Sequence, residues 1–227
     1  MSILFKLDER LSVCAELVRD GSKLADIGTD HAYLPVWLAK NGKISSAIAA
    51  DINPNPLERG LENIKKYSAE EIVTTRLSNG LQSVKEYEAD DIVIAGMGAE
   101  MIIDIISKAE WLRCSEKHLI LQPMTRANLL RKYLAENGFS IKSEIACEHS
   151  GKVYSVLSVQ YSGLQSEIDR VEEYLGKLDM SLQISRKYAM QVLKKLCFKR
   201  DGLRCSGNVT TDMDEVIEEI EKRCMYD

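Results

Sequence analysis

The sequence lacks the features that mark membrane and secreted proteins. No apolar run approaches the roughly 18 residues that a helix needs to cross a bilayer, and acids appear within the first ten residues, where a signal peptide would be apolar. Aromatic residues make up only 6% of the 227 residues, but 45% hydrophobic residues suffice for a sizeable core. We therefore expect a cytoplasmic, helix-rich protein without membrane contact, built as one domain with an appendage or as two small domains.

Metal-site and nucleophile motifs are also missing. The six cysteines form no CxxC pair and no Cys/His cluster, so no metal site is expected and the cysteines are interpreted as small core residues of a reducing compartment. The sequence contains neither a G-x-S-x-G turn nor a Walker loop. The net charge of -5 does not favour nucleic acid as a partner, although a local basic patch can outweigh an acidic average.

What is present is an alternation of strand-like and helix-like segments up to about residue 162. This alternation predicts an α/β fold with a mainly parallel, doubly wound sheet, of the order found in Rossmann-like methyltransferases. A terminal hairpin, 140–149 and 152–161, adds an antiparallel edge. The other expected strands are residues 23–27, 44–51, the start of 71–81, 91–95 followed by a glycine turn, and 118–123 ended by Pro123. The expected helices are residues 7–20, 35–41 opened by Pro35, 53–67, a helix that follows the glycine turn and runs to about 111, and 126–139.

The pattern changes near residue 162. Apolar residues then recur at three- and four-residue steps over 164–199, which predicts about ten turns of helix with a candidate bend at Gly176. A loop containing Gly202 and Gly207 precedes a last helix that opens at Thr211. We therefore predict a domain of residues 1–162 and a helical coiled-coil appendage of residues 163–227. The long helix can pair within one chain or across two, so a monomer and a weak homodimer both remain open.

The stretch 24–35, LADIGTDHAYLP, is the strongest candidate for a ligand site. Open α/β sheets bind ligands outside the carboxyl ends of their strands. A dinucleotide turn carries three glycines, whereas this one has a single glycine, Gly28, between Asp26 and Asp30, and carboxylates repel a pyrophosphate. S-adenosylmethionine has a sulfonium, an ammonium and no phosphate. Asp26 could face the ammonium while Gly28 lets the backbone pass beneath the ligand.

Polar or glycine residues follow the next strands as well. Asp51 ends the second strand and could accept hydrogen bonds from ribose hydroxyls or cap the following helix. The amide of Asn79 could pair with an adenine edge or belong to a simple Asn-Gly turn. Gly96 and Gly98, around Met97, indicate close approach of backbone to a ligand or a turn into the next helix.

The appendage carries a basic segment. Seven Lys and Arg residues fall within nineteen positions that contain one acid, Asp201. Such a segment can follow a phosphate backbone, or it can be a solvated helix face.

Five strings in this order and spacing, ADIGTDHAYLP, AADINPNPLERGLENI, RLSNGL, IVIAGMGAEMI and LILQP, resemble the bacterial tRNA (adenine-22-N1)-methyltransferases. The resemblance implies a class I S-adenosyl-L-methionine enzyme with a Rossmann-like domain and a C-terminal coiled coil, acting on adenine N1 in tRNA. The implied cofactor-binding residues are Asp26, Gly28, Asp51, Ile52, Asn79, Gly80, Gly96 and Met97. The implied catalytic residue is Asp30, and the substrate-binding residues are Arg10, His31, Tyr33, Lys187, Lys194, Lys195, Lys199 and Arg200.

One departure from the family string is visible, because Ala99 stands where the family usually has the last glycine of G-M-G-G. A methyl group there could narrow the loop. The chain also lacks the N-P-P-[FY] turn of enzymes that methylate exocyclic adenine nitrogens, which fits a ring-nitrogen acceptor. The alternatives are a methyltransferase of another RNA or of a small molecule, and a non-catalytic adenosyl-binding RNA-binding or scaffold protein. A NAD oxidoreductase is disfavoured because its phosphate cradle is missing.

Overall fold

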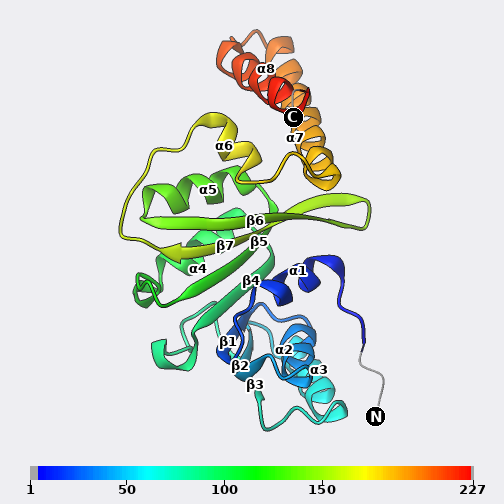
Figure 1. The fold of residues 1–227 in the computed structure, drawn as a ribbon, viewed down its shortest axis with the longest axis vertical. Coiled ribbons are helices and arrows are strands. Elements are labelled where there is room, and N and C mark those ends of the chain that lie inside the picture. Colours follow the sequence, from blue (N-terminus) through cyan, green and yellow to red (C-terminus); the bar gives the residue numbers. More distant parts are fainter. Residues whose placement is uncertain (1–4, 226–227) are drawn as a thin grey trace.

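A seven-stranded sheet of order β3-β2-β1-β4-β5-β7-β6 forms the centre of the molecule (Figure 1). The computed structural model describes residues 5–225. The first five strands run parallel, and β7 pairs antiparallel with both β5 and β6. The strands are β1 (Ser22–Ile27), β2 (Ile44–Asp51), β3 (Val73–Leu77), β4 (Asp91–Gly98), β5 (His118–Thr125), β6 (Phe139–His149) and β7 (Lys152–Tyr161). The predicted sheet class is confirmed, including its antiparallel edge.

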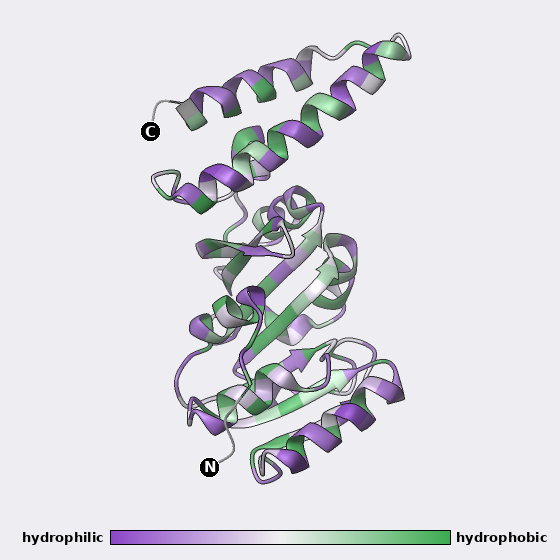
Figure 2. Ribbon diagram, turned by 90° about the vertical axis from the view of Figure 1, so that its right-hand side faces the viewer, coloured by the Kyte–Doolittle hydropathy of each residue, from purple (hydrophilic) through white to green (hydrophobic). Residues whose placement is uncertain are grey.

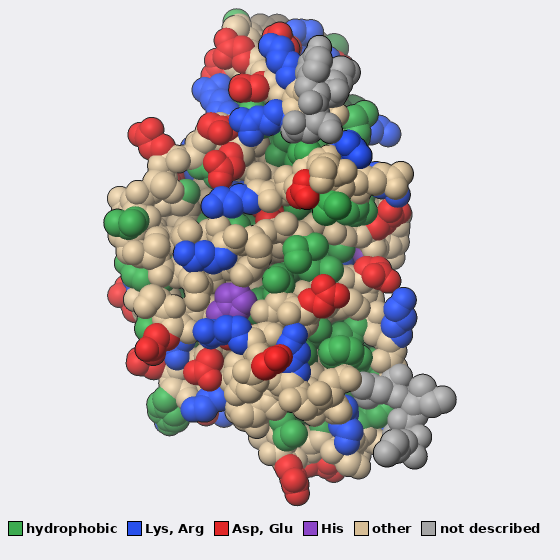
Figure 3. All heavy atoms as spheres, in the orientation of Figure 1, with side chains coloured by type: hydrophobic (Ala, Val, Ile, Leu, Met, Phe, Trp, Pro, Cys, Tyr) green, Lys and Arg blue, Asp and Glu red, His purple; other side chains and the backbone are tan. Residues whose placement is uncertain are grey.

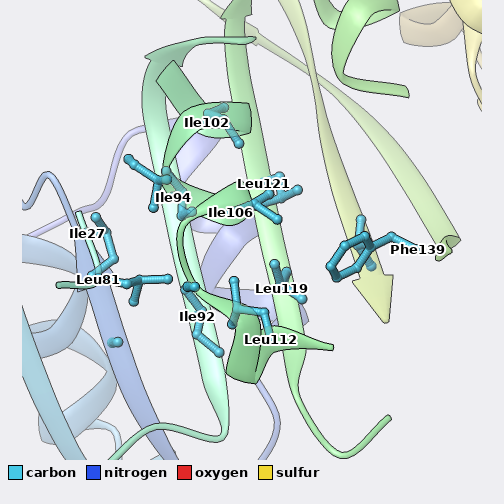
Figure 4. Packing of buried hydrophobic residues seen from close by; sticks show 14 of the residues in the cluster. Ile27, Leu81, Ile92, Ile94, Ile102, Ile106, Leu112, Leu119, Leu121 and Phe139 are labelled. Carbon is cyan, nitrogen blue, oxygen red and sulfur yellow. The ribbon is translucent and has the colours of Figure 1, made fainter. Parts of the chain in front are cut away.

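Helices cover both faces of this sheet because its central strands are apolar on both sides. In β4, Ile92 and Ile94 face one layer and Val93 faces the other, as the two-residue period of a strand requires (Figure 4). One face packs against α1 (Glu9–Leu17), α2 (Tyr33–Lys40) and α3 (Pro54–Lys66); the other packs against α4 (Ala99–Ser107) and α5 (Ala127–Glu136), with short 3-10 turns η1 (Glu86–Glu88) and η2 (Glu110–Leu112) between elements.

Several predicted boundaries are wrong, among them two helix ends, since α1 spans Glu9–Leu17 and α4 ends at Ser107. The segment Gly96–Gly98 continues β4, with register shifts beside Met97, rather than forming a turn after it. Pro123 does not end β5, which runs to Thr125, because a strand with an irregular register tolerates a residue that lacks an N–H. Pro35 is the third residue of α2 rather than the first; it still lies in the first turn, where no backbone N–H has a helical partner.

The prediction of one long helix over residues 164–199 is also wrong. Two helices, α6 (Arg170–Leu175) and α7 (Gln183–Cys205), are separated by a turn, and α8 (Thr211–Met225) follows. Gly176 stops α6 with a φ of 65°, and a Cβ there would clash with the Glu144 carboxylate. Gly202 lies inside α7 rather than in the loop. The three helices share a small core, in which α7 and α8 lie side by side (Figure 2); whether they form a coiled coil stays a prediction.

A buried arginine joins these helices to the sheet. Arg131 of α5 is fully buried and pairs with the equally buried Glu144 of β6, with 2.5 Å between Nη2 and Oε1. Its other donors reach α6, β7 and α7, through the carbonyl oxygens of Glu173 and Tyr174 and the hydroxyls of Ser155 and Tyr188. Because every donor nitrogen of this guanidinium has a partner, the buried charge is compensated and the C-terminal helices are anchored in one orientation.

Within residues 5–225, no helix is both long and apolar enough to span a membrane. The same part of the chain has no group of three or more His, Cys, Asp or Glu side chains arranged to hold a metal ion. All six cysteines are free.

Candidate functional site

The carboxyl ends of four adjacent strands bring the predicted cofactor residues to one edge of the sheet. Asp26 and Gly28 lie at the end of β1, Asp51 at the end of β2 and Met97 near the end of β4. Ile52, Asn79, Gly80 and Gly96 complete the set at the same edge. Strand order reverses between β1 and β4, which is the place where open α/β sheets bind ligands.

Asp26 is buried and has one side-chain hydrogen-bond partner. Its Oδ2 accepts a hydrogen bond from the Thr29 hydroxyl at 2.6 Å. Burial, together with the nearby carboxylates of Asp30 and Asp51, raises the pKa of Asp26 to about 6, and the hydrogen bond from Thr29 only partly opposes this shift. An opposite charge placed here would therefore be bound strongly, because it would relieve an unfavourable buried anion.

Two glycines and a methionine shape the floor of the site. Gly28 has a φ of 74°, and its N–H donates to the Ala50 carbonyl at 2.8 Å, which turns the chain across the end of β2. A Cβ at residue 28 would meet the end of the flexible Met97 side chain, which would have to shift, and the positive φ itself favours glycine there. Gly96, with a φ of 80°, donates its N–H to the fully buried Gln122 side chain at 3.1 Å.

The ends of β2 and β3 combine a carboxylate with exposed apolar side chains. Asp51 uses Oδ1 to accept a hydrogen bond from the Asn53 N–H at 2.7 Å, and no partner is recorded for its other oxygen within the described chain. Ile52 and Leu77 are both 59% exposed, and the side chain of Asn79 is exposed beside them. A carboxylate between exposed apolar side chains suits a ligand with hydroxyl groups next to a flat apolar ring.

Asp30 is the most exposed acid of the site, with 81% of its side chain accessible, and its Oδ1 lies 3.0 Å from Nε2 of His31. His31 and Ala32 both adopt left-handed backbone conformations, with φ of 57° and 55°. The Asn63 amide donates to the His31 carbonyl at 2.9 Å and supports this turn. The Tyr33 ring stacks on the His31 ring at 5.5 Å between centroids. Consecutive strained residues that a neighbour holds in place are typical of functional turns.

Arg10 lies in the first turn of α1, beside the end of β5. Its Nη2 pairs with Asp8 at 2.9 Å, its Nη1 lies 3.1 Å from the Met124 sulfur, and its guanidinium sits 5.9 Å from the Tyr154 ring centroid. Arg10 thus supports residues at the end of β5 and in β7. Its Nε is buried without a hydrogen-bond partner among the described residues.

The fold pairs some basic residues of α7 with acids and leaves others without an ion pair. Lys187 pairs with Glu148 of β6 at 2.8 Å, and Arg200 pairs with Asp201 at 2.9 Å and lies 3.6 Å from Asp214 of α8. In three dimensions, Glu148 and Asp214 from other elements therefore join Asp201 beside this segment. No ion pair is recorded within residues 5–225 for the other three predicted contacts, Lys194, Lys195 and Lys199. On the face shown in Figure 3, acidic and basic side chains are interspersed over the C-terminal helices.

Two further side chains at this edge, Thr29 and Arg126, were not singled out from the sequence, whereas Gln122 is the polar residue expected at the end of the fifth strand. Thr29 holds the Asp26 carboxylate, and its place inside the G-T-D turn is a signal that could have identified it. Gln122 holds the backbone of Gly96, which only the pairing of β4 with β5 reveals. Arg126 follows β5 in a left-handed conformation and pairs with Glu100 at the start of α4.

Comparisons with known proteins agree with this geometry. A protein-family profile described as a methyltransferase domain matches residues 7–157. A curated tRNA (adenine(22)-N(1))-methyltransferase from Bacillus subtilis is 34% identical over 173 residues, which is 76% of this chain and 73% of that protein.

Solved structures extend the likeness over nearly the whole chain. The crystal structure of the B. subtilis m1A22 tRNA methyltransferase superposes with a TM-score of 0.79 at 28% identity, covering 96% of each chain. A Streptococcus pneumoniae protein in complex with S-adenosyl-L-methionine gives a TM-score of 0.81 at 30% identity, covering 93% of this chain and 97% of that one. The C-terminal helices are therefore part of what these proteins share.

Proposed function

This chain belongs to the tRNA (adenine(22)-N(1))-methyltransferase family, and on that premise we propose that it transfers a methyl group from S-adenosyl-L-methionine to N1 of adenine 22 in tRNA. The observation that carries the proposal is the buried, partly unsatisfied Asp26 beside Gly28 at the topological switch point of the sheet. A carboxylate in that place selects a cationic ligand and disfavours a pyrophosphate.

The residues present fit this cofactor. Asp26 would face its ammonium group, and the bare backbone at Gly28 and Gly96 would leave room for the methionine part. The free oxygen of Asp51 would accept a hydrogen bond from the ribose, Ile52 would lie against the adenine, and Asn79 with Gly80 would border its edge. When bound, S-adenosyl-L-methionine supplies a methyl carbon made electrophilic by the attached sulfonium.

The acceptor needs no base before the reaction. Adenine N1 already holds an in-plane lone pair, so the protein must expose the base, orient it in line with the methyl group and accommodate the cation that forms. N1 is paired inside a duplex, so the nucleotide must leave the helix to reach the edge of the sheet. Positioning and electrostatics are therefore the tasks of this site.

Asp30 is the residue we assign to the developing charge. Its exposed carboxylate stands next to Asp26 but on the open side of the turn, within reach of a base placed over Met97. There it would accept a hydrogen bond from the adenine amino group and stabilise the positive charge on the methylated ring. His31 and Tyr33, stacked on each other, would border the same base.

The role of Asp30 is tested with Asp30→Asn. We expect kcat to fall at least about 100-fold while cofactor affinity changes little, because an oriented charge is lost from the transition state only. Wild-type turnover in this variant would contradict the assignment. Asp104→Asn, which changes an exposed acid farther along α4 that pairs with Lys108, is the matched control.

The reaction itself is tested by incubating the purified protein with unmodified tRNA and labelled S-adenosyl-L-methionine. Nucleoside mass spectrometry should find 1-methyladenosine at position 22 and none in a transcript carrying guanosine there. Cofactor binding without methyl transfer to tRNA would instead favour the non-catalytic alternative.

A further inference from the structure

A cavity lies between the catalytic edge of the sheet and the C-terminal helices, and its volume is about 550 Å³. The end of β5 and the turn after it, residues 123–129, form one wall, and α7 forms the opposite wall. Tyr154 and Tyr188, both buried, contribute to the lining. A volume of this size is typical of a small-ligand or nucleotide site.

The cavity adjoins the methyl-transfer site through strand pairing. Pro123 and Thr125 of β5 lie in register with Met97 and Gly98 of β4, on neighbouring parallel strands. Adjacent strands are separated by about 4.8 Å. A polymer bound in the cavity would therefore continue directly toward a base placed over Met97.

Two of the three lysines of α7 without a recorded ion pair border this cavity. Lys195 and Lys199 are four residues apart, so they lie on one face of the helix, and both contribute to the wall. Lys194 does not contribute to it, and Lys187 and Arg200, which do not line it either, are neutralised by acids. Arg126 lines the opposite wall, but it pairs with Glu100 and is therefore neutralised as well.

The walls are held in fixed positions before any ligand arrives. The Arg131 guanidinium connects α5, the sheet and Tyr188 of α7, and Tyr188 itself lines the cavity. Gln191 of α7 exchanges two hydrogen bonds with the backbone of Val153 in β7, at 2.8 and 3.1 Å. A preformed site loses less conformational entropy on binding than one that must close.

Resting on the proposed function, we infer that this cavity holds the sugar-phosphate backbone of the tRNA next to the target nucleotide, with Lys195 and Lys199 contacting its phosphates. An enzyme that turns a base out of a helix must hold the flanking backbone while unstacking proceeds. The two lysines on one wall, which have no recorded ion pair within the described residues, match the charge of that backbone, and the tyrosines in the lining suit an adjoining base.

The test uses the full-length double variant Lys195→Ala/Lys199→Ala. We expect the Kd for tRNA to rise about tenfold or more at 0.1 M salt, with unchanged affinity for S-adenosyl-L-methionine. The slope of log Kd against log salt concentration should decrease by about 1.5, because each lost phosphate contact removes about 0.7 to 0.9. Lys65→Ala/Lys66→Ala removes the same charge from α3, near the opposite end of the sheet, and is expected to leave the tRNA Kd unchanged.

Two outcomes would overturn the inference. The first is a wild-type tRNA Kd and salt slope in the double variant, combined with a normal thermal melt. The second is an equal loss of affinity for Lys194→Ala and Lys195→Ala, since that would place tRNA on the helix surface at large rather than in the cavity. Failure of the wild-type protein to methylate tRNA would instead count against the proposed function, so the two failures are distinguishable.

Discussion

Two buried aspartates at opposite ends of neighbouring strands behave in opposite ways. Asp91 begins β4 at the amino edge of the sheet, and Asp26 lies near the end of β1 at the carboxyl edge. Burial would raise the pKa of Asp91, but hydrogen bonds from His118 and from the backbone and side chain of Arg19 outweigh it and lower that pKa. Asp26 has only Thr29, and its pKa is raised to about 6.

The difference separates a structural acid from a binding acid. Asp91 is satisfied by the protein itself, since its two oxygens contact Arg19 at 2.6 and 2.7 Å and His118 at 3.4 Å. His118 in turn contacts Ser158 at 2.7 Å, so this Asp-His-Ser chain is buried and fully occupied. Asp26 keeps a buried charge without a counterion, which marks a place for a ligand.

The largest expected effect comes from removing the structural acid, Asp91. Asp91→Ala should lower the free energy of unfolding by about 3 kcal/mol, because His118 and the Arg19 guanidinium lose their shared partner. Urea unfolding at pH 7 measures this loss of free energy of unfolding. Asp104→Ala, which removes an exposed pair with Lys108, should cost less than about 1 kcal/mol; equal losses would refute the distinction.

Asp26→Asn should weaken cofactor binding without lowering stability, in contrast to Asp91→Ala. The Kd for S-adenosyl-L-methionine should rise about 10- to 100-fold, because the ammonium loses a charge-assisted partner. Folding raises the pKa of this carboxyl from 3.8 to about 6, so the wild-type protein loses stability as pH rises through that window, and the variant does not. Calorimetric titration and thermal melts at pH 8 should therefore show weaker binding with a melting temperature at or above that of the wild type.

The pH dependence of cofactor binding is a second test of the role of Asp26. Only the ionised carboxylate of Asp26 attracts an ammonium, so affinity should be nearly constant above pH 7 and fall by about tenfold between pH 7 and pH 5. Titration calorimetry across pH 5 to 8 measures this. The Asn variant should show a flat profile, and a wild-type protein with a flat profile would contradict the assignment of Asp26 to the ammonium.

The smallest expected effect belongs to the partner of Asp26. Thr29→Val removes the hydrogen bond that favours the ionised carboxylate, so the midpoint of the pH profile should move upward and affinity at pH 7 should fall about 3- to 10-fold. Thr29→Ser keeps a hydroxyl and should restore the wild-type profile. If the Ser variant binds as weakly as the Val variant, the effect comes from packing rather than from the hydrogen bond.

Much of the fold could be predicted because local patterns encode it. The run 44–51 alternates between two apolar layers and ends at an acid, and the structure has β2 at the same residues. The hairpin around Ser150 likewise follows from turn residues between two alternating runs. The sequence indicates Gly176 only as a candidate bend, because the contact with Glu144 that requires glycine there comes from a different element.

The sequence by itself determined the strand-turn-helix units, the acids and glycines at their ends, and the resemblance that implied the cofactor. Tertiary structure alone decided which charges are free. Lys187 is neutralised by Glu148, which lies 39 residues earlier in the chain, and the same packing leaves Lys195 and Lys199 facing a cavity. The physical reason is that periodicity and turn chemistry act over a few residues, whereas desolvation and ion pairing depend on which elements the core brings together.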